Sequence, residues 1–168
     1  MTTHRTLPHD PYIEAVTDAL TSAGLRLEQV DVRDSETQGT YCYLDAVLTL
    51  TPEASGIDQD TWPHGLILIW EWHTGHEAPW EPERGPVWKF AELQEDGSNA
   101  YPADLPVNGY ASPDAVVEAT RKVLTGEVRP YPYIPTVHEQ GWAGGDIGGP
   151  WEKADELEAA CVAWDKQE

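Results

Sequence analysis

The sequence predicts an α+β domain with one mainly antiparallel sheet of about four strands and with helices packed on one face. Three segments lead to this prediction. Apolar and polar residues alternate over 41–50, an unbroken apolar run covers 66–70, and an apolar stripe at helical spacing follows the Ser-Pro pair at 112–113. Alternation is typical of a half-buried strand, whereas spacings of three and four residues are typical of an amphipathic helix. With 168 residues, the chain is long enough to bury one core.

The first elements are expected to be a helix over 11–24 and a strand near 25–32. Asp10 can cap the helix, Pro11 suits the first helical position, and Gly24 suits the left-handed residue that ends a helix. Apolar residues recur at helical spacing between these ends. The polar residues that follow the strand predict a turn.

Three further strands are expected at 41–50, 66–73 and 87–93. The strand 41–50 has one apolar and one wetter face, as expected for a sheet covered on one side only. The strand 66–73 carries the longest apolar run and should lie centrally in the sheet. The segment 100–110 contains two prolines, so we expect an edge strand or an extended cover there.

The clearest helix is expected over 113–125. Ser112 can cap it, Pro113 takes its first position, and Gly126 ends it. Arg121 and Lys122 lie near its C-terminus, where the helix dipole favours positive charge.

The composition changes after this helix. Six glycines and four prolines between 126 and 150 predict an extended linker or arm. A C-terminal helix over 151–164 follows, and its apolar stripe must dock on this chain or on another. The stripe consists of Trp151, Ala154, Leu157, Cys161 and Trp164. We therefore expect a single α+β domain over 1–126, a linker or arm over 127–150, and a C-terminal helical segment over 151–168.

The charge is the strongest compositional signal. The chain has 10 Lys and Arg against 30 Asp and Glu, a net charge of −20 that is spread along the sequence. Such a field repels nucleic acids and anionic membranes and attracts basic proteins. The alternative is that the charge only keeps the chain soluble. The absence of a long apolar segment, and of an apolar signal at the N-terminus, predicts a cytoplasmic location with Cys42 and Cys161 as reduced core cysteines.

The end of the central strand offers a candidate metal site. If Thr74-Gly75 formed a two-residue hairpin loop, His73 and His76 would be directly opposed and Glu71 would lie diagonal to them. Two imidazoles and a carboxylate on one face are ligands for a divalent metal ion. The alternative is a solvated strand end that runs into a polar loop, with no cofactor.

The following loop is the candidate partner-binding site. Trp80 stands among carboxylates in "EAPWEPERG", so it can clamp a cationic side chain against its ring. The predicted partner-binding residues are Glu77, Trp80, Glu81 and Glu83.

Three stretches, "PYIEAVTDAL", "LILIWEWHTG" and "YASPDAVVEATRKVLTGE", resemble an uncharacterised family of small actinobacterial and actinophage proteins, catalogued as a domain of unknown function. The resemblance covers about residues 11–126 and rests on the order of these stretches. It implies a helix, several strands with an apolar-Trp-Glu core strand, and a Pro-started helix that ends in Gly. It implies no activity, catalytic residue or cofactor, and the acidic loops and residues 126–168 depart from the usual short ending of the family.

We therefore predict a non-enzymatic, acidic binding or regulatory protein that engages a basic protein partner. Its sharpest version is a phage-related DNA mimic in which carboxylates take the place of phosphates on a nucleic-acid-binding protein. Direct binding of nucleic acid or membrane is not expected. One alternative is a divalent-metal-dependent hydrolase that uses Glu71, His73 and His76. Another is a structural phage component that forms a homo-oligomer through its C-terminal helix.

Overall fold

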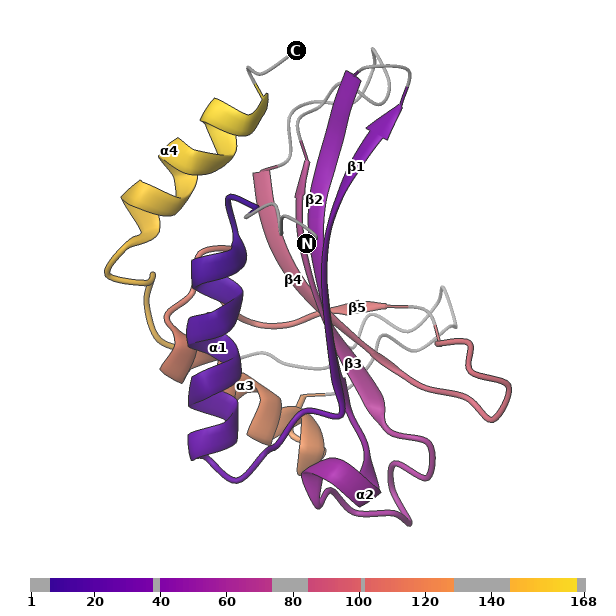
Figure 1. Ribbon diagram of the computed structural model, residues 1–168. Helices are drawn as coiled ribbons and strands as arrows, with labels where there is room; N and C mark the ends of the chain where they lie inside the picture. The colour runs from indigo at the N-terminus through magenta and orange to yellow at the C-terminus, as the bar shows by residue number, and fades with distance from the viewer. Residues whose placement is uncertain (1–6, 38–39, 74–84, 101, 129–145, 166–168) are drawn as a thin grey trace, which may run out of the picture.

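A computed structural model of the chain describes residues 7–37, 40–73, 85–100, 102–128 and 146–165 (Figure 1). In chain order its elements are α1 (Asp10–Ser22), β1 (Gln29–Thr37), β2 (Thr40–Leu50), α2 (Pro52–Ser55), β3 (Leu66–His73), β4 (Gly85–Glu92), β5 (Ala103–Asp104), α3 (Pro113–Leu124) and α4 (Ala154–Asp165).

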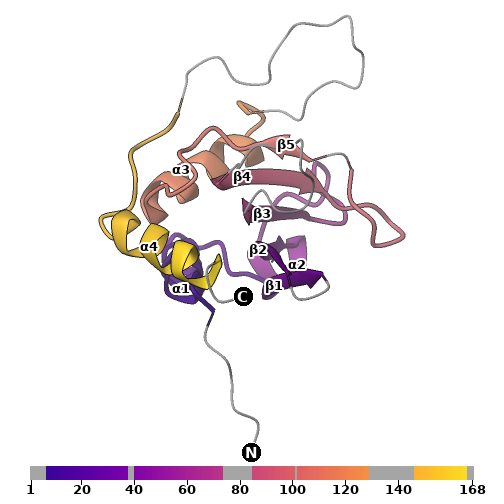
Figure 2. The same cartoon turned by 90° about the horizontal axis from the view of Figure 1, so that it is seen from above.

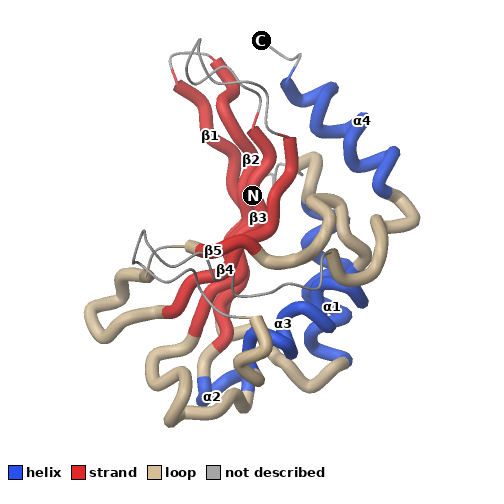
Figure 3. The backbone as a smooth tube through the Cα atoms, turned by 180° about the vertical axis from the view of Figure 1, so that it is seen from behind, coloured by secondary structure: helices blue, strands red, loops and turns tan. Residues whose placement is uncertain are grey.

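The five strands form one antiparallel sheet in the order β1-β2-β3-β4-β5. The helices α1, α3 and α4 lie on one side of this sheet, as Figures 1 and 3 show from opposite directions. The α+β prediction is confirmed, and β3 is central as expected. The additional strand β5 is a two-residue edge strand in the proline-containing segment.

The core lies between the sheet and the helices. Alternate residues of β2, from Leu44 to Leu50, are fully buried there, as their pattern predicts. Trp70 and Trp72 point to the same side of β3 as Leu66 and Leu68 do, and all four are at most 2% exposed. These buried rings and aliphatic side chains give the fold most of its apolar burial.

Helix α1 ends as predicted and begins differently. Gly24 adopts φ +86°, and the Leu25 amide donates to the Leu20 carbonyl at 2.8 Å, which is the bond pattern of a Schellman motif. This bond keeps residue 25 in the helix cap, so β1 begins at Gln29 instead of residue 25. The strand also runs on to Thr37, through polar residues that were predicted to form a turn, because these residues pair with β2. The N-cap residue is His9, not Asp10 as predicted; the Asp10 carboxylate accepts from the Leu7 amide.

Helix α3 has the predicted boundaries to within one residue. The Ser112 hydroxyl accepts from the Ala115 amide at 3.2 Å, and Pro113 is the first helical residue. Gly126 follows the helix with φ +83°. The helix packs against α1, where the Arg121 guanidinium donates to the Ala23 carbonyl.

The chain returns to the domain through the residues just before α4. The Ile147 amide donates to the Pro106 carbonyl at 2.7 Å, and the Trp151 amide donates to the Tyr110 carbonyl at 2.6 Å. Between these bonds, the Ser112 amide donates to the Gly149 carbonyl. The last part of the predicted linker is therefore docked along residues 106–112.

Helix α4 packs on its own chain. Leu157, Cys161 and Trp164 are at most 4% exposed, and the Trp164 ring meets the Trp72 ring edge to face at 6.5 Å. The helix begins at Ala154, three residues later than predicted, because Trp151 still bonds to the residue 110 backbone. Burial raises the pKa of the Cys161 thiol to about 12, so this cysteine is a protonated core residue. Among the described helices, none combines the length and apolarity needed to cross a membrane.

Candidate functional site

The predicted metal site lies only partly within the described residues. His73 ends β3, and its cross-strand partner on β4 is Gly85. The connection therefore spans residues 74–84, and the two-residue hairpin that would oppose His73 to His76 is not formed. His76 itself lies outside the described residues, as do the predicted partner-binding residues Glu77, Trp80, Glu81 and Glu83.

Glu71 lies on the sheet face that is turned away from the helices. Its carboxylate forms an ion pair with Lys89 on β4, with 3.5 Å between Oε1 and Nζ. Its cross-strand neighbour on β2 is Asp45. Within the described part of the chain, no group of three His, Cys, Asp or Glu side chains could hold a metal ion. The metal site at Glu71, His73 and His76 thus stays a prediction.

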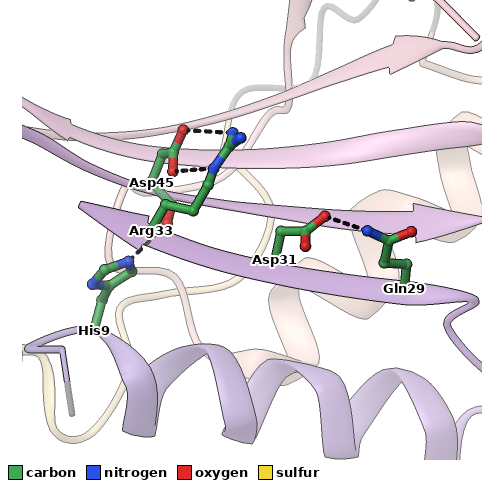
Figure 4. Close-up of polar contacts among 5 residues, drawn as sticks. All are labelled: His9, Gln29, Asp31, Arg33 and Asp45. Carbon is green, nitrogen blue, oxygen red and sulfur yellow. Dashed lines mark hydrogen bonds and ion pairs between the residues drawn. The ribbon is translucent and has the colours of Figure 1, made fainter. Parts of the chain in front are cut away.

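Asp45 also directs its carboxylate to this open face. Arg33 pairs directly with Asp45 across β1 and β2. Its guanidinium donates two parallel hydrogen bonds to the Asp45 carboxylate, from Nε to Oδ1 at 3.2 Å and from Nη2 to Oδ2 at 3.0 Å (Figure 4). The Arg33 side chain is 61% exposed, so the pair contributes at most about 1 kcal/mol to stability. Its main effect is to cancel a negative charge on the open face.

His9 meets the same residue from the other side of the sheet (Figure 4). Its Nε2 lies 2.8 Å from the Asp45 carbonyl oxygen, which can only accept, so Nε2 carries the proton. The ring is fully buried and stacks on Trp70 with centroids 5.2 Å apart. Burial lowers the pKa of His9 below 6.5, although Asp10, Asp45 and Asp34 partly oppose this. The ring is therefore neutral at pH 7 and fixes the start of α1 on the sheet.

His9 should make the stability of the fold depend on pH. Because its folded pKa is lowered, the unfolded chain binds the proton more readily between the folded pKa and 6.5. The contribution of the neutral ring is complete above about pH 6.5 and is lost as the pH falls, by up to about 1.4 kcal/mol per pH unit. Chemical denaturation at several pH values should show this loss, and His9→Gln should lack it. Parallel pH profiles for the two proteins would contradict the role of His9.

The described residues also contain a cleft between the first turns of α1 and α4. In Figure 1, α4 lies near the N-terminal end of α1, and Figure 2 shows α4 over α1 when seen from above. The cleft has a volume of about 260 Å³. It is lined by Pro8, Pro11, Tyr12, Trp151, Lys153, Glu156, Leu157 and Ala160.

Hydrogen bonds and ring packing hold the aromatic residues that line the cleft. The Trp88 indole donates to the Tyr12 hydroxyl at 3.0 Å, and this hydroxyl donates to the Ala111 carbonyl at 2.5 Å. Burial raises the pKa of the Tyr12 hydroxyl above its ordinary value, so the donor is always present. The Trp151 ring packs on the Tyr12 ring at 5.1 Å. The cleft therefore presents the half-buried Trp151 ring, which is backed by the buried Tyr12 ring and held in place by backbone hydrogen bonds.

The surroundings of the cleft are acidic. Neither α1 nor α4 contains a lysine or arginine. The exposed acidic residues of these two helices are Glu14, Asp18, Asp155, Glu156 and Glu158. The nearest basic residue in sequence is Lys153, whose ammonium lies 6.0 Å from the centroid of the Trp151 ring. Of these acidic residues, Glu156 lines the cleft itself, and a carboxylate beside an aromatic ring has the chemistry of a site for a cation.

The sequence did not point to this cleft. Tyr12 and Trp151 are far apart along the chain, and Trp151 fits the apolar stripe of a helix, so its pattern predicts only burial. The one local signal was a Lys two residues after a Trp, before an acidic helical turn, and this pattern is common by chance. Comparison with protein-family models, curated proteins and solved structures finds no match to this chain.

Proposed function

We propose that this chain is a non-enzymatic binding protein for a basic, nucleic-acid-binding protein, and that it competes with DNA through carboxylates that take the place of phosphates. The observation that carries the proposal is the surface of α1 and α4, which combines exposed carboxylates with an aromatic cleft and has no basic residue within either helix. The net charge of −20 adds long-range attraction for a basic partner.

The same surface makes self-association through the C-terminal helix a weaker proposal. The stripe that would have joined two chains is buried against the sheet of its own chain, with Trp164 on Trp72. A metal-dependent hydrolase draws no support from Glu71, since its carboxylate faces the Lys89 ammonium.

Two matched variants test where the basic partner binds. The first neutralises the helical surface by Glu14→Gln, Asp18→Asn, Glu156→Gln and Glu158→Gln. The second neutralises exposed acids elsewhere by Glu28→Gln, Glu53→Gln, Asp60→Asn and Glu95→Gln. Both change the net charge equally, so a difference between them reports position and not total charge.

The assay measures how much protein displaces a short fluorescent DNA duplex from a polyarginine peptide at low salt. We expect the helical variant to need about tenfold more protein than the native chain, since each exposed carboxylate contributes about 0.3–0.5 kcal/mol. The second variant should lose about threefold or less. Equal losses would show that the charge acts only as a diffuse field, and no displacement by the native chain would overturn the proposal.

A further inference from the structure

We infer that the cleft between α1 and α4 receives a single arginine side chain of the basic partner, and that Lys153 occupies the cleft in the free protein. This inference rests on the proposed function and specifies the group that it recognises. A volume of about 260 Å³ lies below the roughly 300–1,000 Å³ of clefts that hold drug-sized molecules, so one side chain is the fitting occupant.

The walls of the cleft suit a guanidinium group. The half-buried Trp151 ring offers a face and is backed by the fully buried Tyr12 ring. A planar guanidinium stacks on such a face, while an ammonium acts as a point charge. Glu156 lines the same cleft and can accept two parallel N–H bonds from the guanidinium edge. Pro8, Pro11 and Leu157 can pack against the methylene stem.

The positive ends of the helix dipoles do not reverse the preference of the cleft for a cation. The first turns of α1 and α4 border the cleft, and each helix N-terminus is equivalent to about half a positive charge. Asp10 lies in the first turn of α1, and Asp155 and Glu156 lie in the first turn of α4. Asp10 and Asp155 do not line the cleft, but they offset the two dipole ends. The charged groups that line the cleft are the Lys153 ammonium and the Glu156 carboxylate, and this carboxylate can pair with another cation once Lys153 moves away.

Lys153 shows how the aromatic face receives a cation. Its ammonium stands 6.0 Å from the Trp151 ring centroid, at the outer limit of a favourable cation–π contact. The lysine side chain is exposed, and little packing holds it in place. A partner arginine can therefore displace it, and removal of Lys153 should make the cleft more accessible.

The test measures fluorescence anisotropy of two peptides of equal length, one of arginines and one of lysines. The native chain should bind the arginine peptide about threefold to tenfold more tightly, because stacking adds to the shared charge attraction. Trp151→Phe keeps a ring in place but weakens the cation–π contact, and Glu156→Gln removes the carboxylate without touching the core. Each variant should reduce the preference for arginine by about threefold and change binding of the lysine peptide less.

Lys153→Gln and its matched control Arg26→Gln test whether a partner arginine displaces Lys153 from the cleft. Both remove one exposed positive charge, but only Lys153 lines the cleft. Lys153→Gln should tighten binding of the arginine peptide about threefold more than Arg26→Gln does.

The outcomes separate the two proposals. If neither peptide binds the native chain, the proposed function fails and this inference fails with it. If both peptides bind equally, or if Trp151→Phe and Glu156→Gln leave the ratio unchanged in proteins that melt as the native chain does, the arginine cleft is wrong while the acidic binding surface stands.

Discussion

Trp70→Ala is expected to lower the free energy of unfolding by about 3–5 kcal/mol. The Trp70 ring is fully buried, stacks on His9, and meets the Tyr12 ring edge to face at 5.9 Å. Its indole also donates to the Gly109 carbonyl at 2.8 Å, so truncation leaves both a cavity and an unpaired acceptor. Urea denaturation followed by circular dichroism measures the change.

Trp70→Phe separates the two contributions. Phenylalanine keeps a ring against His9 but cannot donate to the Gly109 carbonyl, so a smaller loss of about 1–3 kcal/mol is expected. An alanine variant that loses less than about 1 kcal/mol would mean that the ring does not anchor α1 on β3.

Gly65→Ala is expected to cost about 2–5 kcal/mol. Gly65 precedes β3 with φ +91°, a left-handed conformation that costs an L-residue about 1–2 kcal/mol. A Cβ atom there would also lie 2.2 Å from the Leu50 carbonyl oxygen, which is backbone and cannot rotate away. Relief requires β2 and β3 to move apart at the point where Leu50 pairs with Leu66.

Gly97→Ala is the control for the backbone conformation alone. Gly97 has φ +87°, close to that of Gly65, but a Cβ atom there meets nothing within 4 Å. Its loss should be about 1–2 kcal/mol, and the difference between the two variants measures the overlap with Leu50. If denaturant titrations show equal losses of unfolding free energy for the two variants, the strands move apart at Gly65 at no energetic cost.

Some elements were predictable because their signals are local. The Ser112–Pro113 start and Gly126 stop of α3 act within one turn of the backbone, so the residues themselves specify the boundaries. The alternation in β2 likewise determines which side chains are buried, since a strand turns successive residues to opposite faces. The same reasoning placed Trp70 and Trp72 on the core face of β3.

Other boundaries depended on contacts that the pattern does not contain. Leu25 is apolar and was predicted to begin a strand, but its amide closes the cap of α1 instead. Asp10 has the chemistry of an N-cap, yet His9 takes that position because its ring is held between Trp70 and the Asp45 carbonyl. Side chains in tertiary contact outweighed the local preference in this helix.

The sequence by itself determined the class of fold, the central strand, the buried face of the sheet and the acidic character of the surface. These properties follow from periodicity, capping residues and charge, which act over a few residues or over the whole composition. Only the tertiary structure decided that α4 docks on its own sheet and that Trp151 meets Tyr12 to form the cleft. That contact joins the two ends of the described chain, and its geometry depends on backbone bonds such as Trp151 to Tyr110, which leave no trace in residue spacing.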